Sequence, residues 1–149
     1  MESPVKAANN YKNKASGLAI FFGNTVLLAK RSKNCYITGE PAPFGGYWSI
    51  FAGALEKGER HQECAVREVL EEAEIKIDSN KLKYINTIVN DKTKLRIYGV
   101  ESEEMLYPKL NPEHTAYGWF NIDTLDSFSE KIDPKVVKSV IKYAKKRKK

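Results

Sequence analysis

GALEKGERHQECAVREVLEEAEI, residues 53–75, is the stretch from which the organisation of the whole chain follows. Its first half contains Gly53 and Gly58, which permit tight or left-handed backbone, whereas residues 60–75 contain neither Gly nor Pro. The stretch therefore predicts a glycine-containing loop that leads directly into a helix.

The predicted helix has an apolar side and an acidic side, counted at about 100° per residue. The apolar stripe consists of Val66, Val69, Leu70 and Ala73. The acidic side consists of Glu68, Glu71 and Glu72, at i, i+3 and i+4 spacing, where helical side chains are neighbours. Like charges at this spacing destabilise a helix by about 0.2–0.5 kcal/mol. The pattern alone is compatible with a solvated acidic face and with a site for a hard divalent cation.

The whole stretch resembles the Nudix box, whose pattern is G-x5-E-x7-R-E-U-x-E-E-x-G-U, where U is a bulky aliphatic residue. The matching positions are Gly53, Glu59, Arg67, Glu68, Val69, Glu71, Glu72 and Ile75. So many fixed positions at the correct spacing make the motif a specific signal. The resemblance implies an α+β fold, the Nudix α/β/α sandwich with a mixed central β-sheet. It would span residues 15–145, between an N-terminal arm (residues 1–14) and a basic tail (residues 146–149).

The same resemblance implies a hydrolase that cleaves a diphosphate linkage with Mg²⁺ or Mn²⁺ as cofactor. By similarity, the metal ligands would be Glu68, Glu71, Glu72 and the carbonyl oxygen of Ala52. Glu59 would lie beside them as a ligand or proton acceptor, and Glu59 and Glu68 are the implied catalytic residues of the box. Arg67 would hold carboxylates in place, with Glu63 and Glu71 at i−4 and i+4, while Gly53 and Gly58 support the loop.

Three positions depart from the family pattern. Glu74 stands where the family has its last Gly, and Phe51 and Ala52 replace the Pro-Gly that is usual before Gly53. A Cβ atom at a position built for positive φ costs about 1–2 kcal/mol. No carboxylate is lost, but these changes keep a non-catalytic Nudix-like binding module as an alternative.

Length and composition indicate one domain in a reducing, cytoplasmic setting. The chain of 149 residues is long enough for a single core, and Cys35 and Cys64 are too few for a disulfide framework. The polar N-terminus has no apolar core of a signal peptide, and the apolar run at residues 18–29 is too short to span a membrane. Gly23-Asn24 interrupts that run and predicts a β-hairpin.

The rest of the chain predicts further strands and a final helix. Apolar and β-branched runs predict strands at residues 82–89, 94–100 and 117–120, and residues 122–125 suggest a single helical turn. Asp133 fits an N-cap and Pro134 a first helical position. The apolar stripe of this helix would be Val136, Val137, Val140, Ile141 and Ala144.

We expect the residues that select the substrate to lie outside the box, because the box would bind the diphosphate and the metal, which are common to all substrates of the class. The loop that begins at residues 30–33 is basic and rich in Gly and Pro, and its position suggests a substrate-facing lid or a solvated surface loop. Four side chains are candidates for substrate binding: Lys30, Arg31, Tyr47 and Trp48. An aromatic residue beside a short strand is, however, more often a core residue.

The segment NPEHTAYGWF, residues 111–120, contains a further candidate. Many Nudix proteins place a glutamate just ahead of a tryptophan-bearing strand, and Glu113 occupies that place. The family analogy makes Glu113 a metal ligand or general base, against the alternative of an ordinary loop carboxylate. His114 is its neighbour, for which a substrate hydrogen bond and plain solvent exposure are both considered, with exposure preferred.

The sequence thus predicts a pyrophosphohydrolase acting on a nucleoside diphosphate derivative such as ADP-ribose, a dinucleoside polyphosphate or a nucleotide sugar. The alternative substrate is RNA, through removal of a 5′ diphosphate or cap. Residues 145–149 are five consecutive cations, which RNA could contact, although a solvated helix end explains them as well. A homodimer is a further hypothesis about partners.

Overall fold

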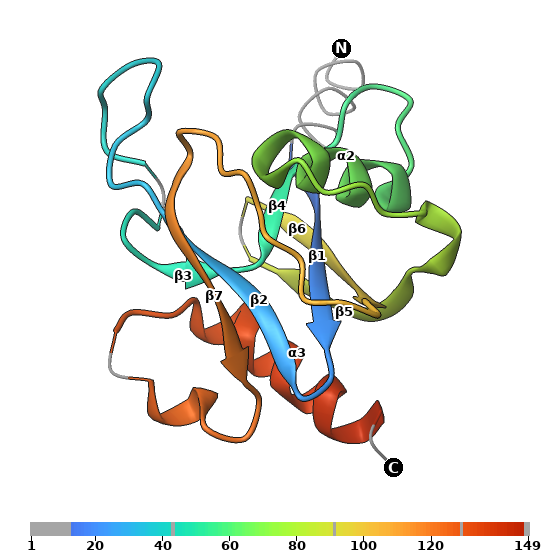
Figure 1. The fold of residues 1–149 in the computed structure, drawn as a ribbon. Helices are drawn as coiled ribbons and strands as arrows, with labels where there is room; N and C mark the ends of the chain where they lie inside the picture. The colour runs from blue at the N-terminus through green and yellow to red at the C-terminus, as the bar shows by residue number, and fades with distance from the viewer. Residues whose placement is uncertain (1–12, 43, 91, 129, 148–149) are drawn as a thin grey trace.

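We describe residues 13–42, 44–90, 92–128 and 130–147 in a computed structural model of the protein (Figure 1). Nearly all of the predicted N-terminal arm and the last two residues of the basic tail lie outside the described residues. The strands are β1 (Lys14–Phe22), β2 (Thr25–Arg31), β3 (Trp48–Ser49), β4 (Phe51–Ala54), β5 (Lys83–Val89), β6 (Lys94–Glu101) and β7 (His114–Asn121). The helices are α2 (His61–Ala73) and α3 (Pro134–Arg147), with 3₁₀ turns η1 (Ser79–Lys81) and η2 (Leu125–Ser127).

The strands form one mixed sheet that separates the two helices (Figure 1). Alternation along β1 sends Leu18 and Ile20 into a core under α2, and Ala19 and Phe21 into a core above α3. Each helix therefore has its own apolar layer, and the predicted α/β/α sandwich is confirmed.

The strand β1 is the centre of the sheet. Its last residues pair antiparallel with β2, its first residues pair antiparallel with β4, and its whole length pairs parallel with β6. The strand β2 turns away from β1 after the hairpin and pairs instead with β3 and β7. Because β3 and β4 follow each other directly, the segment 48–54 crosses from β2 to β1 and opens a cleft between them.

Several predicted elements are confirmed. The hairpin closes at Gly23-Asn24, where Phe22 pairs with Thr25 and Gly23 has φ +57°. The helix α3 begins at Pro134, and Oδ1 of Asp133 accepts a hydrogen bond of 3.3 Å from the backbone N–H of Val136. The helical turn predicted at residues 122–125 lies further along, in η2, because Ile122 is still buried at the end of the sheet.

The predicted division of α2 into an apolar and an acidic side is confirmed for Val69 and Ala73 and is wrong for Leu70 and Glu72. The helix buries Cys64, Ala65, Val69, Glu72 and Ala73, whereas the Leu70 side chain is 42% exposed. Small residues on this side let the helix approach the sheet closely, so the carboxylates of the same side point inward. Glu72 therefore faces the sheet, whereas the Glu71 side chain stays 55% exposed to solvent.

The C-terminal cations mostly belong to a helix. Because α3 continues to Arg147, the last three residues that the structure describes form its final turn and not a separate tail. Within the described residues, the helices are too short or too polar to cross a membrane.

Candidate active site

Gly53 brings the β4 strand into contact with the acidic helix. It pairs with Ser16 of β1, and a Cβ atom built at Gly53 would overlap the carboxylate of Glu68. Glycine is therefore required here for close approach rather than for an unusual backbone angle. Gly58, in contrast, has φ +79° and open space around it, so that its requirement is conformational.

Arg67 lies at the centre of a network of carboxylates. Its Nε and Nη2 atoms donate to both oxygens of Glu59, at 2.7 and 3.0 Å, and Nη1 donates to Glu68 at 2.7 Å. Nη1 also reaches Glu71 at 3.2 Å, and Nη2 donates to the carbonyl oxygen of Ala54 at 3.0 Å. One guanidinium thus connects the glycine loop to two successive turns of α2.

Glu63 is not part of this network, contrary to the spacing argument. Its Oε1 atom accepts a hydrogen bond of 3.0 Å from the backbone N–H of Arg60, and its Oε2 atom forms an ion pair of 3.4 Å with the Arg60 side chain. These contacts satisfy the first turn of α2, because the leading N–H groups of a helix have no partner within it.

Glu59 is fixed by its neighbours. Besides the two Arg67 contacts, its Oε1 atom accepts a hydrogen bond of 2.9 Å from the backbone N–H of Glu56. Hydrogen bonding to Arg67 is the largest cause that holds the pKa of Glu59 below its usual range. Because these hydrogen bonds favour the ionised carboxylate, Glu59 is better suited to holding Arg67 in position than to accepting a proton.

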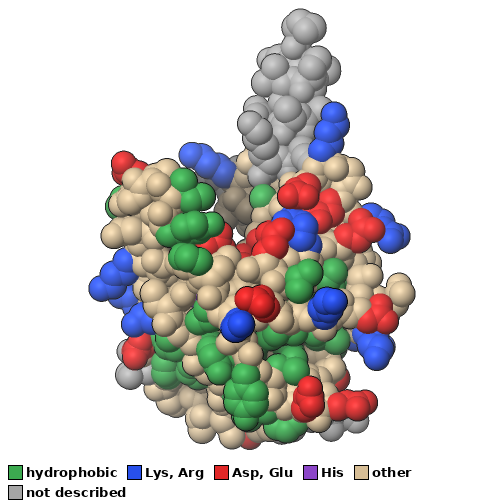
Figure 2. All heavy atoms as spheres, turned by 45° about the horizontal axis from the view of Figure 1, so that its top comes forward, with side chains coloured by type: hydrophobic (Ala, Val, Ile, Leu, Met, Phe, Trp, Pro, Cys, Tyr) green, Lys and Arg blue, Asp and Glu red, His purple; other side chains and the backbone are tan. Residues whose placement is uncertain are grey.

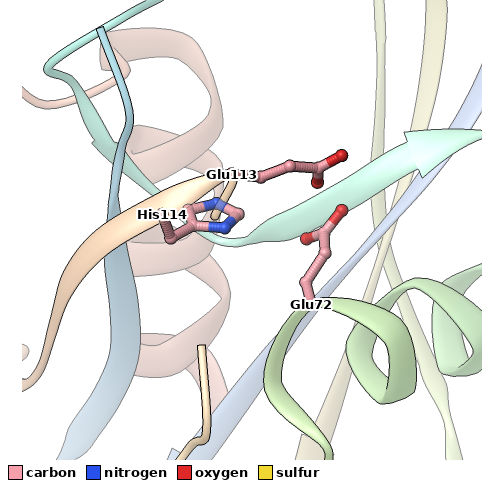
Figure 3. Close-up of side chains that lie close together, drawn as sticks. All are labelled: Glu72, Glu113 and His114. Carbon is pink, nitrogen blue, oxygen red and sulfur yellow. The ribbon is translucent and has the colours of Figure 1, made fainter. Parts of the chain in front are cut away.

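Glu72, Glu113 and His114 form a second cluster, which Figure 3 shows at the meeting point of α2 and the start of β7. Their ligand atoms all lie within 4.8 Å of one another. Glu72 is 3% exposed, and among the described residues no donor reaches its buried Oε1 atom. Burial, followed by the proximity of Glu68 and Glu113, raises the pKa of Glu72 far above its usual range.

This cluster fits a divalent cation. A buried carboxylate that lacks a donor and faces other carboxylates is stabilised by a cation and destabilised without one. The oxygen atoms of Glu68, Glu72 and Glu113 are the kind of ligand that Mg²⁺ prefers. Acidic side chains gather at the α2 end of the molecule, as Figure 2 shows. Glu71 is more peripheral, since its side chain is 55% exposed and bound to Arg67.

His114 is buried, so the preferred expectation of solvent exposure is wrong. Its ring packs edge-on against Phe51 with centroids 5.2 Å apart, and no partner among the described residues reaches Nδ1. Burial, helped by the charge of Arg31, lowers the pKa of His114 to about 4. The imidazole is therefore neutral near pH 7 and adds no positive charge to the carboxylate cluster. Phe51, one of the departures from the family pattern, covers it.

A cleft of about 430 Å³ lies beside Gly53 and His114. Its lining includes Arg31, Phe44, Tyr47, Ala52, Gly53 and His114. The candidates Arg31, Tyr47 and His114 are thus brought together beside the box, where the predicted ligand residue Ala52 also lies.

Lys30 and Trp48 do not belong to this cleft, and these two substrate-binding predictions are corrected. The two residues pair across β2 and β3, and both bind Glu130, Lys30 at 3.5 Å and the indole Nε1 at 3.0 Å. The Trp48 ring is buried in the core on the α3 face, against the rings of Phe120 and Phe128. Successive residues of a strand point to opposite faces, so neighbours of Arg31 and Tyr47 turn away from the cleft.

Asn111 is a positioning residue that the sequence did not single out. Its backbone N–H donates to the carbonyl oxygen of Glu72 at 3.1 Å, and its Nδ2 donates to that of Glu71 at 3.3 Å. Its Oδ1 atom accepts from the backbone N–H of Glu113 at 2.9 Å. Asn111 therefore ties the end of α2 to the loop that carries Glu113. Sequence spacing contained no signal for a contact between such distant segments.

Comparison with known proteins identifies the family. The NUDIX domain model matches residues 12–140, and the chain therefore belongs to the Nudix hydrolase family. A search of curated proteins gave no significant match.

Solved structures share the fold at low sequence identity. The MutT protein from Methanosarcina mazei Go1 is 18% identical, with a TM-score of 0.69 over 91% of this chain and 94% of that one. The NUDIX domain of Shewanella oneidensis NrtR, complexed with ADP ribose, is 14% identical, with a TM-score of 0.69 over 96% and 98%. A MutT/nudix family protein from Enterococcus faecalis is 17% identical, with a TM-score of 0.61 over 73% of this chain but 43% of that one.

Proposed function

We propose that the protein is a Mg²⁺- or Mn²⁺-dependent pyrophosphohydrolase that cleaves the diphosphate linkage of a nucleoside diphosphate derivative. The substrates we favour are ADP-ribose, a dinucleoside polyphosphate or a nucleotide sugar. The proposal depends most on Glu72, a buried carboxylate whose Oε1 atom has no donor among the described residues and which lies beside Glu113 and His114. The ADP ribose held by the Shewanella NUDIX domain supports a substrate of this kind.

The residues that would hold the metal are Glu68, Glu72 and the carbonyl oxygen of Ala52, with the more exposed Glu71 at the periphery of the site. A divalent ion at this place supplies Lewis-acid stabilisation of the phosphate oxygens. Arg67 holds Glu68 and Glu71 toward the site, and Gly53 leaves room for the Glu68 carboxylate.

Glu113 is the best candidate for the general base. It is half-buried at the end of a loop, and among the described residues it forms no hydrogen bond or ion pair with Arg67. Glu59 is a poorer candidate, because both of its oxygens already accept hydrogen bonds. We assign proton removal from the attacking water to Glu113 and a positioning role to Glu59.

Arg31 and Tyr47 would bind the substrate along the cleft. The Arg31 guanidinium can meet phosphate oxygens in two-point contacts, and the Tyr47 ring offers a face for a base or sugar. The ammonium group of Lys131 lies 5.5 Å from the centre of that ring and adds positive charge at this edge.

The test measures kcat/KM for ADP-ribose, a dinucleoside polyphosphate, a nucleotide sugar, a nucleoside triphosphate and capped RNA, each with Mg²⁺ and with Mn²⁺. We expect one of the first three to be preferred, and Glu72→Gln to lower turnover at least about a hundredfold, as loss of a metal ligand does. The matched control is Glu63→Gln, which makes the same change on the same helix outside both carboxylate clusters.

Each part of the proposal can fail separately. Near-normal turnover in Glu72→Gln would contradict the metal site, and nucleotide binding without hydrolysis under all metals would favour a binding module. A preference of more than about a hundredfold, roughly 2.7 kcal/mol, for the triphosphate or the capped RNA would replace the substrate but keep the site.

A further inference from the structure

A groove separates β5 from α3, on the face of the sheet opposite the carboxylates. It consists of one cavity of about 610 Å³ and an adjoining one of about 340 Å³, which share Asn86, Ser139 and Lys142 as lining residues. Because the two cavities share these lining residues, they lie next to each other along the helix and together form the groove. The proposed hydrolysis does not use this groove, because Glu72 lies on α2, which covers the other face of the sheet.

A row of lysines follows the groove along α3. The lining lysines are Lys135, Lys138, Lys142 and Lys146. At a rise of 1.5 Å per residue, successive members lie about 4.5 to 6 Å apart along the helix axis, so the row extends over about 16 Å. Such a row matches a chain of anionic groups better than a single phosphate.

The four lysines form no ion pair among the described residues, although Lys135 lies near the Asp133 carboxylate. All four side chains are exposed. Arg147 differs, because it forms an ion pair of 2.7 Å with Glu101 and donates to the carbonyl oxygen of Gly23 at 2.7 Å. The lysines are therefore available to a partner, whereas Arg147 anchors the helix end to the sheet.

The groove also offers uncharged contacts. Nδ2 of Asn86 donates to Oγ of Ser139 at 3.0 Å between β5 and α3, so amide and hydroxyl groups lie beside the lysines. Tyr84 also borders the groove, but its ring packs edge-on against Tyr98 with centroids 6.1 Å apart, on the α2 face of the sheet. The groove therefore offers basic side chains with amide and hydroxyl groups, which are the groups that proteins use to contact the phosphates and sugars of a nucleic-acid backbone.

We propose that this groove binds the phosphodiester backbone of a single-stranded nucleic acid, independently of the hydrolytic site. A membrane surface fits less well, because the apolar side of α3 is already buried in the core through Val136, Val137, Val140, Ile141 and Ala144. A basic helix needs a free apolar side to enter the lipid interface.

The test measures the binding of a labelled, unstructured RNA of about 12 nucleotides by fluorescence anisotropy between about 50 and 200 mM salt. For the whole chain, four neutralised phosphates give a slope of log K against log salt of about −3, at about −0.7 each. The groove variant is Lys138→Gln/Lys142→Gln/Lys146→Gln, for which we expect at least tenfold weaker binding and a slope near −1.

The matched control is Lys57→Gln/Lys76→Gln/Lys109→Gln, which removes three exposed lysines outside the groove. Both variants lose the same charge from a net +6, so a difference between them reports position and not overall charge. Equal weakening by both variants would overturn the proposal, as would no binding by the unaltered chain at the lowest salt. Thermal unfolding of both variants verifies that the fold is intact.

Two further measurements separate the remaining explanations. Binding to vesicles that contain anionic lipid, without binding to RNA, would replace the proposal by a membrane surface. The groove variant should hydrolyse the small nucleotide substrate at the same rate as the unaltered protein. If the unaltered protein hydrolyses none of these substrates, the RNA-binding measurement still tests the groove, because it does not depend on hydrolysis.

Discussion

Gly53 has a hydrogen atom where any other residue would have a Cβ atom, and this leaves room for the Glu68 carboxylate. Gly53→Ala would place a methyl group where the Glu68 carboxylate now lies, and that flexible side chain would have to move aside. We therefore expect a loss of kcat of at least about a hundredfold with only a modest change in stability.

Gly58→Ala is the control for this prediction. It strains a backbone with φ +79° but meets no other atom, so it should lower the free energy of unfolding by about 1 kcal/mol and largely retain activity. Kinetics and urea unfolding of the two variants provide the comparison. Equal activity losses in both would show that Gly53 acts only through the backbone.

Glu74 has a left-handed conformation at the end of α2, with φ +55° and ψ +38°. The departure from the family glycine therefore leaves a Cβ atom in a strained position, as the sequence predicted. Glu74→Gly should raise the free energy of unfolding by about 0.5–1 kcal/mol, which urea denaturation would measure. A decrease would mean that the Glu74 side chain makes a stabilising contact in solution.

The surroundings of several side chains in the candidate site could not be predicted from the sequence. Motif spacing placed Glu68 and Glu72 correctly on one helix, but it could not show that Glu72 would be buried or that Glu113 would meet it. These facts depend on how α2 packs against the sheet and on the loop held by Asn111. Trp48 was ambiguous for the same reason, since nothing local indicates which face of a two-residue strand is covered.

The loop before α2 is held to that helix by one guanidinium. Arg67→Lys keeps the charge but loses most of the hydrogen bonds to Glu59, Glu68 and Ala54. Because the carboxylates of Glu59 and Glu68 are only 12% exposed, we expect a loss of about 1–3 kcal/mol of stability and a lower kcat.

Urea unfolding and steady-state kinetics of this variant test the prediction, with Arg60→Lys as the control. Arg60 bonds Glu63 at the exposed start of the same helix, so its replacement should change stability by less than about 1 kcal/mol. Similar effects of the two replacements would argue against a special role for Arg67.

Secondary structure was predictable where local chemistry determines it. The Gly23-Asn24 hairpin, the strands on either side of residues 90–93 and the start of α3 follow from turn residues, β-branched runs and a cap. The orientation of α2 did not follow, because the count of apolar residues favoured Leu70 while packing against β4 favoured Ala65 and Cys64. Small residues such as Ala65 and Cys64 contribute little to a hydrophobic pattern in the sequence, and yet they let the helix pack most closely against the sheet.

Stability of the whole protein should depend on pH through Glu72. Burial raises the pKa of this group, so its contribution to stability is present below about 4.5, the usual glutamate value, and is lost as pH rises above it. In a chelator, Glu72→Gln should therefore be more stable than the unaltered protein, by an amount that grows from about pH 5 to about pH 8.

Added Mg²⁺ should reverse this order at about pH 8, because it stabilises only the protein that binds it. Urea unfolding at both pH values, with and without Mg²⁺, measures the effect, and Glu63→Gln is again the control. A stability difference that does not vary with pH would mean that the buried carboxylate is not the cause.

The parallel pairing of β1 with β6 delays the completion of the centre of the sheet during synthesis. Lys14 pairs with Lys94 and Phe21 with Glu101, so an inner edge of the central strand has no partner until the second half of the chain has been made. At about 5–20 residues per second, the segment from Ala54 to Lys94 takes a ribosome about 2–8 s. During that interval the apolar strand is exposed beside its finished hairpin, and the nascent chain is most prone to aggregation and most in need of a chaperone.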